Sequence, residues 1–399
     1  MFVCLGAALG LLITINGGRI GQTFSNGWFM IGGSIICYWV TAILIDRTLR
    51  YPGRGSSLVS VPLTLLPLLV LIAVIALGRL YYSRPYLICF GTVTLIWTFA
   101  RYQVQRRPSV RALAVLPFGE LELLDSITNI RFVKLRKPVI PHANFDGIVV
   151  DMHADVPPEW LKFVGDLVMQ QKRIYHVASL VESMAGLVSL KHVAAMHLDN
   201  LQPSPIFNPL KRGLDIAVAG IGGAVLLPVA LLLALLIRIE SKGPTIYRQR
   251  RIGVNGKEFT LLKFRSMRND AESAGAQFTT ENDPRITRLG GFIRKTRLDE
   301  LPQLWNILKG EMSLVGPRPE RPKFVMEYET SIPHYQLRHR VRPGLTGWAQ
   351  IETGYSSDLE GTIHKVERDF YYIKYRSTAL DLFIIYRTVR TVVFGNGAR

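Results

Sequence analysis

The 399-residue sequence has little cysteine and no recognisable metal motif. Its three cysteines, Cys4, Cys37 and Cys89, each lie inside an apolar segment, and its eight histidines show no ligand spacing. Disulfide frameworks and zinc knuckles need cysteines or histidines at short, paired spacings. The pattern therefore favours neither a disulfide framework, nor a bound zinc ion, nor redox chemistry.

Acidic residues are scarce relative to basic ones. The chain has 30 Asp and Glu against 48 Lys and Arg, which gives a formal net charge of +18, and the basic excess is larger after residue 200. Such an excess favours an anionic partner: nucleic acid, anionic lipid or a phosphorylated substrate. No nucleic-acid-binding motif is found, and the charges alternate with long apolar segments, so we predict no nucleic-acid partner.

Long apolar segments are abundant, and 48% of the residues are hydrophobic. Stretches of membrane-spanning length occur at about residues 1–16, 27–45, 58–78 and 85–100. Arginines gather between the second and third stretches and after the fourth. The positive-inside rule then places the N-terminus and everything after residue 101 in the cytoplasm. We therefore expect a four-helix transmembrane region over residues 1–104.

A fifth apolar block, at residues 216–237, has a different pattern. Basic residues flank it on both sides: Lys211, Arg212, Arg238 and Lys242. Both of its ends are therefore expected in the cytoplasm. Pro228 lies near its middle, where the missing N–H and the ring kink a helix. A plain spanning helix is the alternative, but we predict a re-entrant membrane helix over residues 212–238, because it satisfies both observations.

Residues 105–202 alternate short apolar runs with helical patterns. Four runs are expected to be strands of a small parallel sheet: Ala112–Pro117, Arg131–Leu135, Gly147–Asp151 and Arg173–Ala178. This layout predicts a Rossmann-like α/β domain. No G-x-G-x-x-G follows the first strand, which favours a regulatory or assembly role over dinucleotide binding. Prolines at residues 201–210 indicate a linker, so a third domain is expected over residues 203–399.

The third domain is dense in Arg, Gly, Pro and acidic residues. Its notable segments are Lys263–Met267, Gly291–Gln303, Gly316–Pro319, Arg342–Gln350 and Asp369–Tyr372. Trp348 and the Tyr371–Tyr372 pair could stack on a base or lie at the headgroup boundary, but core packing is the more frequent fate of such residues.

The acidic pair Asp299–Glu300 is predicted to lie at the start of a helix. The buried stripe of that helix is expected to be Leu301, Leu304, Trp305 and Leu308. Pro302 suits its first turn and Gly310 its end. The free N–H groups and the dipole at that point favour anions. A capping carboxylate with a solvated neighbour is the alternative interpretation, although nearby cations at residues 294–297 weaken it.

These residue types suit a pyrophosphate substrate. Its charge requires Lys, Arg and a divalent ion, and one carboxylate can hold the ion while another attacks phosphorus to give an acyl phosphate. A phosphate acceptor is already ionised near neutral pH, which favours Asp299 as a nucleophile rather than a general base. The turn at residues 316–319 would hold Arg318 rigidly for a bidentate phosphate contact, and an ordinary structural turn fits equally well.

In this order, the segments closely resemble the bacterial sugar transferases called polyprenyl-phosphate hexose-1-phosphate transferases, in their large monotopic form. The match covers about residues 208–399 by motif and the upstream half by architecture. The resemblance implies that Asp299 is the catalytic nucleophile and that Glu300 is its catalytic partner and a Mg²⁺ ligand. The substrate-binding residues that it implies are Lys263, Arg265, Arg297, Arg318 and Arg342.

The implied fold is an α-helical membrane bundle, a Rossmann-like α/β middle domain, and an α-rich α+β phosphoglycosyl transferase domain with the re-entrant helix. The implied reaction moves hexose-1-phosphate from a UDP-sugar to polyprenyl (undecaprenyl) phosphate and releases UMP, which starts an exopolysaccharide or O-antigen unit. The resemblance also implies glucose or galactose as the sugar, a bacterial inner-membrane location, a homodimer, and an N-terminus trimmed relative to longer members.

Two other functions remain open at this point. One is a non-catalytic membrane protein that senses a ligand or scaffolds polysaccharide assembly, which absence of Asp299 or Arg318 would have favoured. The other is an ordinary membrane glycosyltransferase, which would release UDP and usually has a D-x-D-like metal motif. No such motif occurs near the basic cluster.

Overall fold

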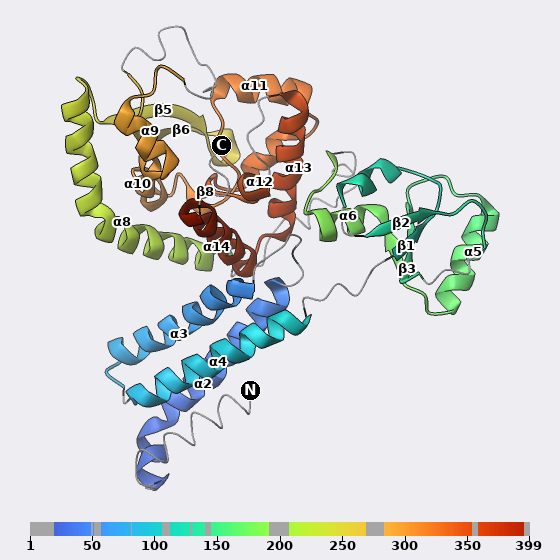
Figure 1. Ribbon diagram of the computed structural model, residues 1–399, viewed down its shortest axis with the longest axis horizontal. Helices are drawn as coiled ribbons and strands as arrows, with labels where there is room; N and C mark the ends of the chain where they lie inside the picture. The colour runs from blue at the N-terminus through green and yellow to red at the C-terminus, as the bar shows by residue number, and fades with distance from the viewer. Residues whose placement is uncertain are drawn as a thin grey trace. The chain divides into compact units, whose positions relative to one another are not determined.

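The structure is a computed structural model. It describes residues 20–48, 51, 57–80, 82–105, 112–127, 130–139, 145–190, 207–268, 283–352 and 358–394. The chain divides into two compact units, residues 1–186 and 187–399 (Figure 1). The domain boundaries predicted after residues 104 and 202 stay predictions.

Three apolar helices lead the described chain. They are α2 (Ile20–Thr48), α3 (Ser60–Leu77) and α4 (Arg84–Gln105). Each is long and apolar enough to cross a membrane, which agrees with the three spans predicted there. The span predicted at residues 1–16 lies outside the described residues.

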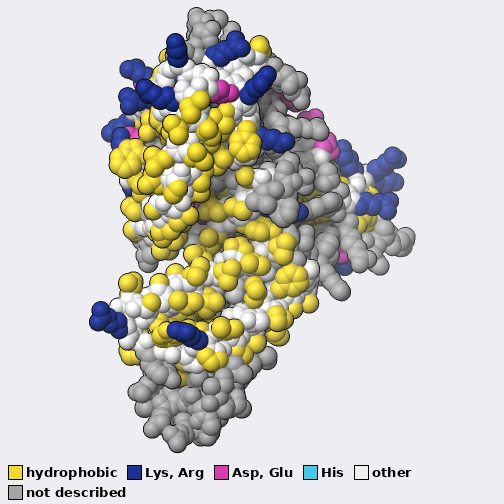
Figure 2. Space-filling view, turned by 60° about the vertical axis from the view of Figure 1, so that its left-hand side comes forward, with side chains coloured by type: hydrophobic (Ala, Val, Ile, Leu, Met, Phe, Trp, Pro, Cys, Tyr) yellow, Lys and Arg dark blue, Asp and Glu magenta, His cyan; other side chains and the backbone are white. Residues whose placement is uncertain are grey.

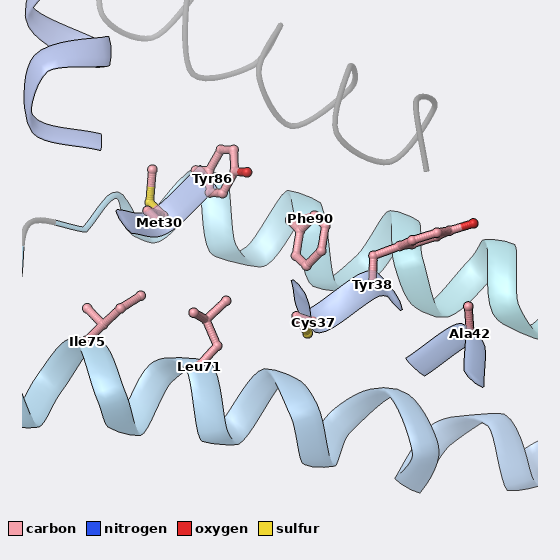
Figure 3. Packing of buried hydrophobic residues seen from close by; sticks show 8 residues of the cluster. All are labelled: Met30, Cys37, Tyr38, Ala42, Leu71, Ile75, Tyr86 and Phe90. Atoms are coloured by element: carbon pink, nitrogen blue, oxygen red, sulfur yellow. The ribbon is translucent and has the colours of Figure 1, made fainter. Parts of the chain in front are cut away.

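The three apolar helices pack through one shared cluster, shown in Figure 3. Its buried members are Met30, Cys37, Tyr38, Ala42, Leu71, Ile75, Tyr86 and Phe90. Some polar groups of the helices pair with one another: the hydroxyls of Thr64 and Thr98 are 3.0 Å apart, and Arg101 pairs with Asp46 at 2.9 Å.

A parallel sheet of four strands follows. The strands are β1 (Ala112–Val115), β2 (Arg131–Lys134), β3 (Gly147–Val150) and β4 (Ile174–His176), in the order β2-β1-β3-β4. All four predicted runs form strands, and the parallel sheet is confirmed. The other elements of this region are η2 (Leu121–Ser126), α5 (Pro158–Met169) and α6 (Val177–Ala185). Trp160 and Leu167 of α5 pack on the sheet, whose strand β3 is wholly buried.

In the second unit, the described helices and strands start with a long helix and include two small sheets. Its elements are α8 (Phe207–Glu240), β5 (Ile246–Ile252), η4 (Val254–Gly256), β6 (Glu258–Phe264), α9 (Arg288–Lys295), η5 (Leu298–Glu300), α10 (Gln303–Lys309), β7 (Ser313–Val315), α11 (Pro322–Ser331), η6 (Tyr335–Arg340), β8 (Gly344–Thr346), α12 (Trp348–Glu352), α13 (Leu359–Tyr375) and α14 (Thr378–Phe394). Strands β5 and β6 form an antiparallel hairpin, and β7 pairs with β8 in parallel.

One part of the core of this unit lies among β7, α12, α13 and α14. Trp348 is 1% exposed, and its ring lies beside those of Tyr371 and Phe383. The Tyr372 hydroxyl donates to the carbonyl of Val315 at 3.0 Å. The aromatic residues at positions 348, 371 and 372 are therefore core residues, which was the more frequent of the two predicted fates.

Helix α8 is bent, and both of its arms pack on the second unit (Figure 1). In the first arm, Arg212 donates to the carbonyls of Ile307 and Leu308 at the end of α10. In the second arm, Leu233 and Ile237 join a core cluster with β6 and α9. We call this bent helix the α8 elbow. It contains Pro228, as predicted for a broken helix.

The α8 elbow exposes many apolar side chains. Figure 2 shows hydrophobic side chains gathered along this side of the second unit, with Lys and Arg at the edge of the patch. Among them are Ile221, Val225, Leu231, Leu235 and Ile239, each more than half exposed. Such a patch marks a membrane or protein contact, and α8 is also apolar enough to enter a membrane.

Candidate active site

The acidic pair lies in η5, the single turn between α9 and α10. Arg297 precedes this turn in the left-handed region, with φ of 58°, which turns the chain between the two helices. Helix α10 then begins after Pro302 and ends at Gly310, whose φ of 86° closes the helix in the left-handed form that glycine adopts freely. The predicted helix is confirmed, with Pro302 at its N-cap instead of inside its first turn.

The predicted buried stripe of α10 is wrong: Leu301, Leu304 and Leu308 are only half-buried. Trp305 is 55% exposed, whereas Gln303, Asn306 and Ile307 are buried. Asn306 changes the face that turns inward, because its side-chain amide accepts from the Leu262 N–H at 3.1 Å and donates to a β6 carbonyl at 2.7 Å. A polar residue thus fixes the helix to β6.

Glu300 is surrounded by three cations. Its Oε1 lies 3.4 Å from Arg318 Nη2, 3.8 Å from Lys263 Nζ and 3.8 Å from Arg297 Nη1. Both Glu300 and the adjacent Asp299 are only 9% exposed. The structure therefore brings together five of the predicted site residues, from β6, η5 and the turn after β7.

The surroundings of the two carboxyl groups shift their pKa values in opposite directions. Burial raises the pKa of Asp299, and the charge of Glu300 raises it further. Burial also acts to raise the pKa of Glu300, but the surrounding cations, led by Arg318, outweigh it and lower that pKa. Burial, with repulsion from Arg318, lowers the pKa of Lys263 to about 8.

Two arginines, the buried Arg338 and the half-buried Arg251, hold the turn that carries Arg318. Arg338 donates to the carbonyl of Arg318 at 2.9 Å and is itself paired with Asp369 at 2.8 Å. From the other side, Arg251 donates to the carbonyl of Pro319 at 2.7 Å. The backbone of the turn is thus fixed on both sides, which orients the Arg318 guanidinium toward Glu300.

Three glycines allow the two loops beside the site to touch. A Cβ at Gly344 would lie 2.1 Å from the nitrogen of Gly316, and one at Gly347 would lie 2.2 Å from its carbonyl oxygen. Any side chain here would push the turn with Arg318 away from the loop at residues 342–350. The glycines in both motifs are therefore needed for close packing.

Two predicted site residues have their hydrogen bonds elsewhere. Arg265 is 6% exposed and donates to the carbonyls of Ile237 and Ser241, which closes the end of α8. Arg342 donates to the carbonyl of Gly310 at the end of α10. Their predicted role as substrate ligands stays a prediction that these bonds do not support.

The α8 elbow encloses the acidic pair. Ala219 of the first arm packs in one cluster with Leu304, Ile307 and Leu308 of α10. The second arm packs in another cluster with α9 and with Leu298 of η5. The turn with the two carboxylates therefore lies between the arms, next to the apolar surface of α8.

Comparison with known proteins decides the family. Residues 206–395 match the family model described as bacterial sugar transferase. A UDP-N-acetylgalactosamine-undecaprenyl-phosphate N-acetylgalactosaminephosphotransferase from Aeromonas hydrophila is 40% identical over 92% of this chain and 88% of its own length. The chain belongs to the bacterial sugar transferases.

Other relatives match only part of this sugar transferase. A UDP-glucose:undecaprenyl-phosphate glucose-1-phosphate transferase from Escherichia coli is 43% identical over 45% of this chain and 39% of its own length. A putative undecaprenyl-phosphate N-acetylgalactosaminyl 1-phosphate transferase from Bacillus subtilis is 52% identical over 36% of this chain and 82% of its own length.

Sequence reasoning missed the buried residues that support the sugar transferase site. Arg251 and Arg338 act through backbone carbonyls far along the chain, and neither belongs to a motif that spacing reveals. Asp369 stood in a noted segment but had no assigned role. The only available signal was a charged residue inside an otherwise apolar helical pattern, which predicts a buried partner of opposite charge.

The site residues of the sugar transferase fit a metal ion shared with a substrate. Among the residues that the structure describes, no group of three or more His, Cys, Asp or Glu could hold a metal. Mg²⁺ is usually bound by one or two carboxylates together with substrate phosphates. Glu300, beside Asp299, provides that donor chemistry.

Proposed function

We propose that this protein transfers a sugar-1-phosphate from a UDP-sugar to undecaprenyl phosphate and releases UMP. The observation that carries the proposal is the single turn with Asp299 and Glu300, packed between the arms of the α8 elbow, with three cations within 4 Å of Glu300. The family and the printed activities of its members support this reaction type.

The first step is attack by Asp299. Its carboxylate oxygen bonds to the sugar-bearing phosphorus, the bond from that phosphorus to the bridging oxygen breaks, and UMP leaves with the bridging oxygen. Arg297 and Arg318 are about half and two-fifths exposed, so they can face the phosphates that carry the charge. Lys263, more deeply buried, adds a third positive charge.

The second step regenerates the carboxylate. An oxygen of undecaprenyl phosphate attacks the same phosphorus, and the acyl–phosphate bond breaks to release the lipid-linked pyrophosphoryl sugar. No proton need be removed from this acceptor. Mg²⁺, held by Glu300 and the substrate phosphates, would supply charge neutralisation when bound.

Membrane placement follows the same proposal. We propose that the α8 elbow is re-entrant, because both arms bond to one unit, which keeps both ends on one side of the bilayer. The positive-inside pattern places that side in the cytoplasm of a bacterium, at the inner membrane. The β2-β1-β3-β4 sheet is proposed to be a Rossmann-like domain, and the homodimer stays a prediction from the family resemblance.

UMP release by the purified protein in nanodiscs tests the reaction. The assay contains undecaprenyl phosphate, Mg²⁺ and one UDP-sugar at a time. UDP-N-acetylgalactosamine and UDP-glucose come first because relatives are named for both sugars, and UDP-galactose follows. We expect UMP release with one donor. When that donor carries ³²P at its sugar-bearing phosphorus and the acceptor is left out, we expect the protein to become labelled.

Asp299→Asn should remove both UMP release and protein labelling, since its amide is a poor nucleophile. Glu258→Gln, an exposed carboxylate on β6, is the matched control and should keep both. Release of UDP would instead identify a glycosyltransferase. UMP release that survives in Asp299→Asn would overturn the covalent step.

A further inference from the structure

Two large aromatic side chains beside the acidic pair face outward. Phe292 on α9 is 56% exposed and Trp305 on α10 is 55% exposed. Phe292 lies seven residues before Asp299, and Trp305 lies six residues after it. The exposed aromatics therefore stand on the two helices that lead into and out of η5, the turn that carries Asp299.

Both helices belong to the surface that the α8 elbow forms. The inner sides of α9 and α10 pack on the second and first arms of α8, respectively. The same arms expose apolar residues such as Ile221 and Leu235. Phe292 and Trp305 thus lie on helices that pack against a helix apolar enough to enter a bilayer.

Exposed cations accompany the aromatics. They are Arg238, Arg288, Lys295 and Lys309. Helix α9 has no acidic residue, and the carboxylate of Glu240, at the end of α8, accepts from the backbone N–H of Leu289. Aromatic rings at the headgroup level with Lys and Arg around them are typical of a membrane–water interface, and anionic lipid attracts such cations.

We propose that Phe292 and Trp305 insert at the headgroup–acyl boundary of an anionic bilayer and fix the depth of Asp299. Because one aromatic stands on each side of the turn, the pair fixes the tilt of the turn relative to the membrane as well as its depth. Asp299 then meets the phosphate of a lipid whose headgroup lies at that same level. The inference goes beyond the proposed transfer reaction, because it concerns where the protein holds its nucleophile.

Fluorescence quenching by brominated lipid tests the insertion without any activity. The full-length protein is placed in nanodiscs of phosphatidylglycerol and phosphatidylcholine with bromines at stated acyl positions. The spectrum of Trp305→Phe is subtracted from that of the wild type to isolate Trp305. We expect Trp305 to be quenched most by bromines near the headgroup. Trp160→Phe, which isolates a tryptophan buried against the parallel sheet, should show no quenching.

Kinetics test the consequence for the site. The double variant Phe292→Ser/Trp305→Ser should raise the KM for undecaprenyl phosphate about tenfold and leave the KM for the UDP-sugar unchanged. Tyr375→Ser, another exposed aromatic, is the control and should leave both constants unchanged. We also expect phosphatidylglycerol to stimulate transfer by the wild type, and Lys295→Gln/Lys309→Gln to weaken that stimulation. Absent quenching of Trp305, or an unchanged acceptor KM in the double variant, overturns the proposal.

Discussion

Asp299 and Glu300 are neighbours in sequence, yet their environments assign them different protonation behaviour. Asp299 carries a raised pKa because it is buried beside a second carboxylate. The surrounding cations lower the pKa of Glu300, which favours its ionised form. A nucleophile that is less stabilised as an anion is more reactive, and a neighbour whose ionised form is favoured suits the binding of a cation. The difference in surroundings therefore matches the two proposed roles.

At the same scale, the buried Lys263 predicts a pH dependence. Its pKa is lowered to about 8, so it is charged below that pH and loses its charge as the pH rises through it. We expect kcat/KM for the UDP-sugar to fall above about pH 8. Lys263 then loses its charge, and with it both its attraction for the substrate phosphates and its pairing with Glu300. The raised pKa of Asp299 should place the acid limb above the ordinary range for aspartate.

Steady-state pH profiles of Lys263→Arg measure this effect. Arginine keeps its charge, so the alkaline limb should move upward by at least about one pH unit. Lys257→Arg, on the exposed turn of the same hairpin, should leave the profile unchanged. An alkaline limb that stays at the same pH in Lys263→Arg would assign it to another group.

The sequence predicts which residues have the chemistry of the site better than it predicts which atoms they contact. Asp299, Glu300 and Arg318 belong to local motifs, and all three meet in the structure. Arg265 stood in an equally basic motif, but its bonds go to the end of α8, more than twenty residues earlier in the chain. Charge and spacing give a residue's chemistry, whereas its partner depends on which distant carbonyl the fold brings close.

At the scale of the element, the α8 elbow combines a proline that breaks its helical hydrogen bonding with two basic residues that bond its first arm to other helices. Pro228 removes one helical hydrogen bond and its ring clashes with the preceding turn, which costs about 3 kcal/mol inside a helix. Straight, the 34 residues would be about 51 Å long, enough to cross a bilayer. Lys211 and Arg212 hold the first arm to α14 and α10, so bending and docking support each other.

Pro228→Leu should therefore shift α8 toward a spanning form by about 3 kcal/mol. Single cysteines at Asn208 and Lys242, in a cysteine-free background, report the side of the membrane on which each end lies. We expect a membrane-impermeant thiol reagent to label both ends from one side in the parent, and only one end in much of the variant population.

Val229→Leu is the matched control, since it changes a neighbouring apolar residue and keeps the proline. It should label like the parent. If both ends of Pro228→Leu still react from one side, the polar attachments of the first arm, and not the proline, hold the elbow.

Elements were predictable where one pattern dominated. The buried strands of the parallel sheet and the long apolar helices follow from runs of apolar residues. Helix α10 was placed correctly, but its buried face was not. Asn306 turns inward to bond β6, and hydrophobic periodicity cannot register a polar side chain that is buried because it is bonded.

At the scale of the whole molecule, the second unit begins earlier than the predicted linker. Leu187 and Val188 are 5% and 0% exposed, and the Val188 N–H donates to the carbonyl of Glu367 in α13. This short segment is thus part of the core of the catalytic unit.

A fragment of residues 187–399 should be more stable than one of residues 203–399. Burial of Leu187 and Val188 contributes about 3 kcal/mol, which corresponds to roughly 6–12 °C in Tm for a unit of this size. Thermal unfolding of both fragments in the same detergent measures the difference. Val188→Ser in the longer fragment should lower its Tm partway, and equal Tm values for the two fragments would place the boundary at the predicted linker instead.

The attachments of α8 also determine when this protein can finish folding during its synthesis. Arg212 must wait for carbonyls 95 and 96 residues later in the chain, and Lys211 must wait for Asp381, 170 residues later. At about 5–20 residues per second, the ribosome needs roughly 10–30 seconds to make that last partner. The second arm of this long apolar helix meets its packing partners in β6 and α9 first, and the partners of Arg212 follow. The attachment of Lys211 comes last, so the first arm is fully held only when translation is nearly complete.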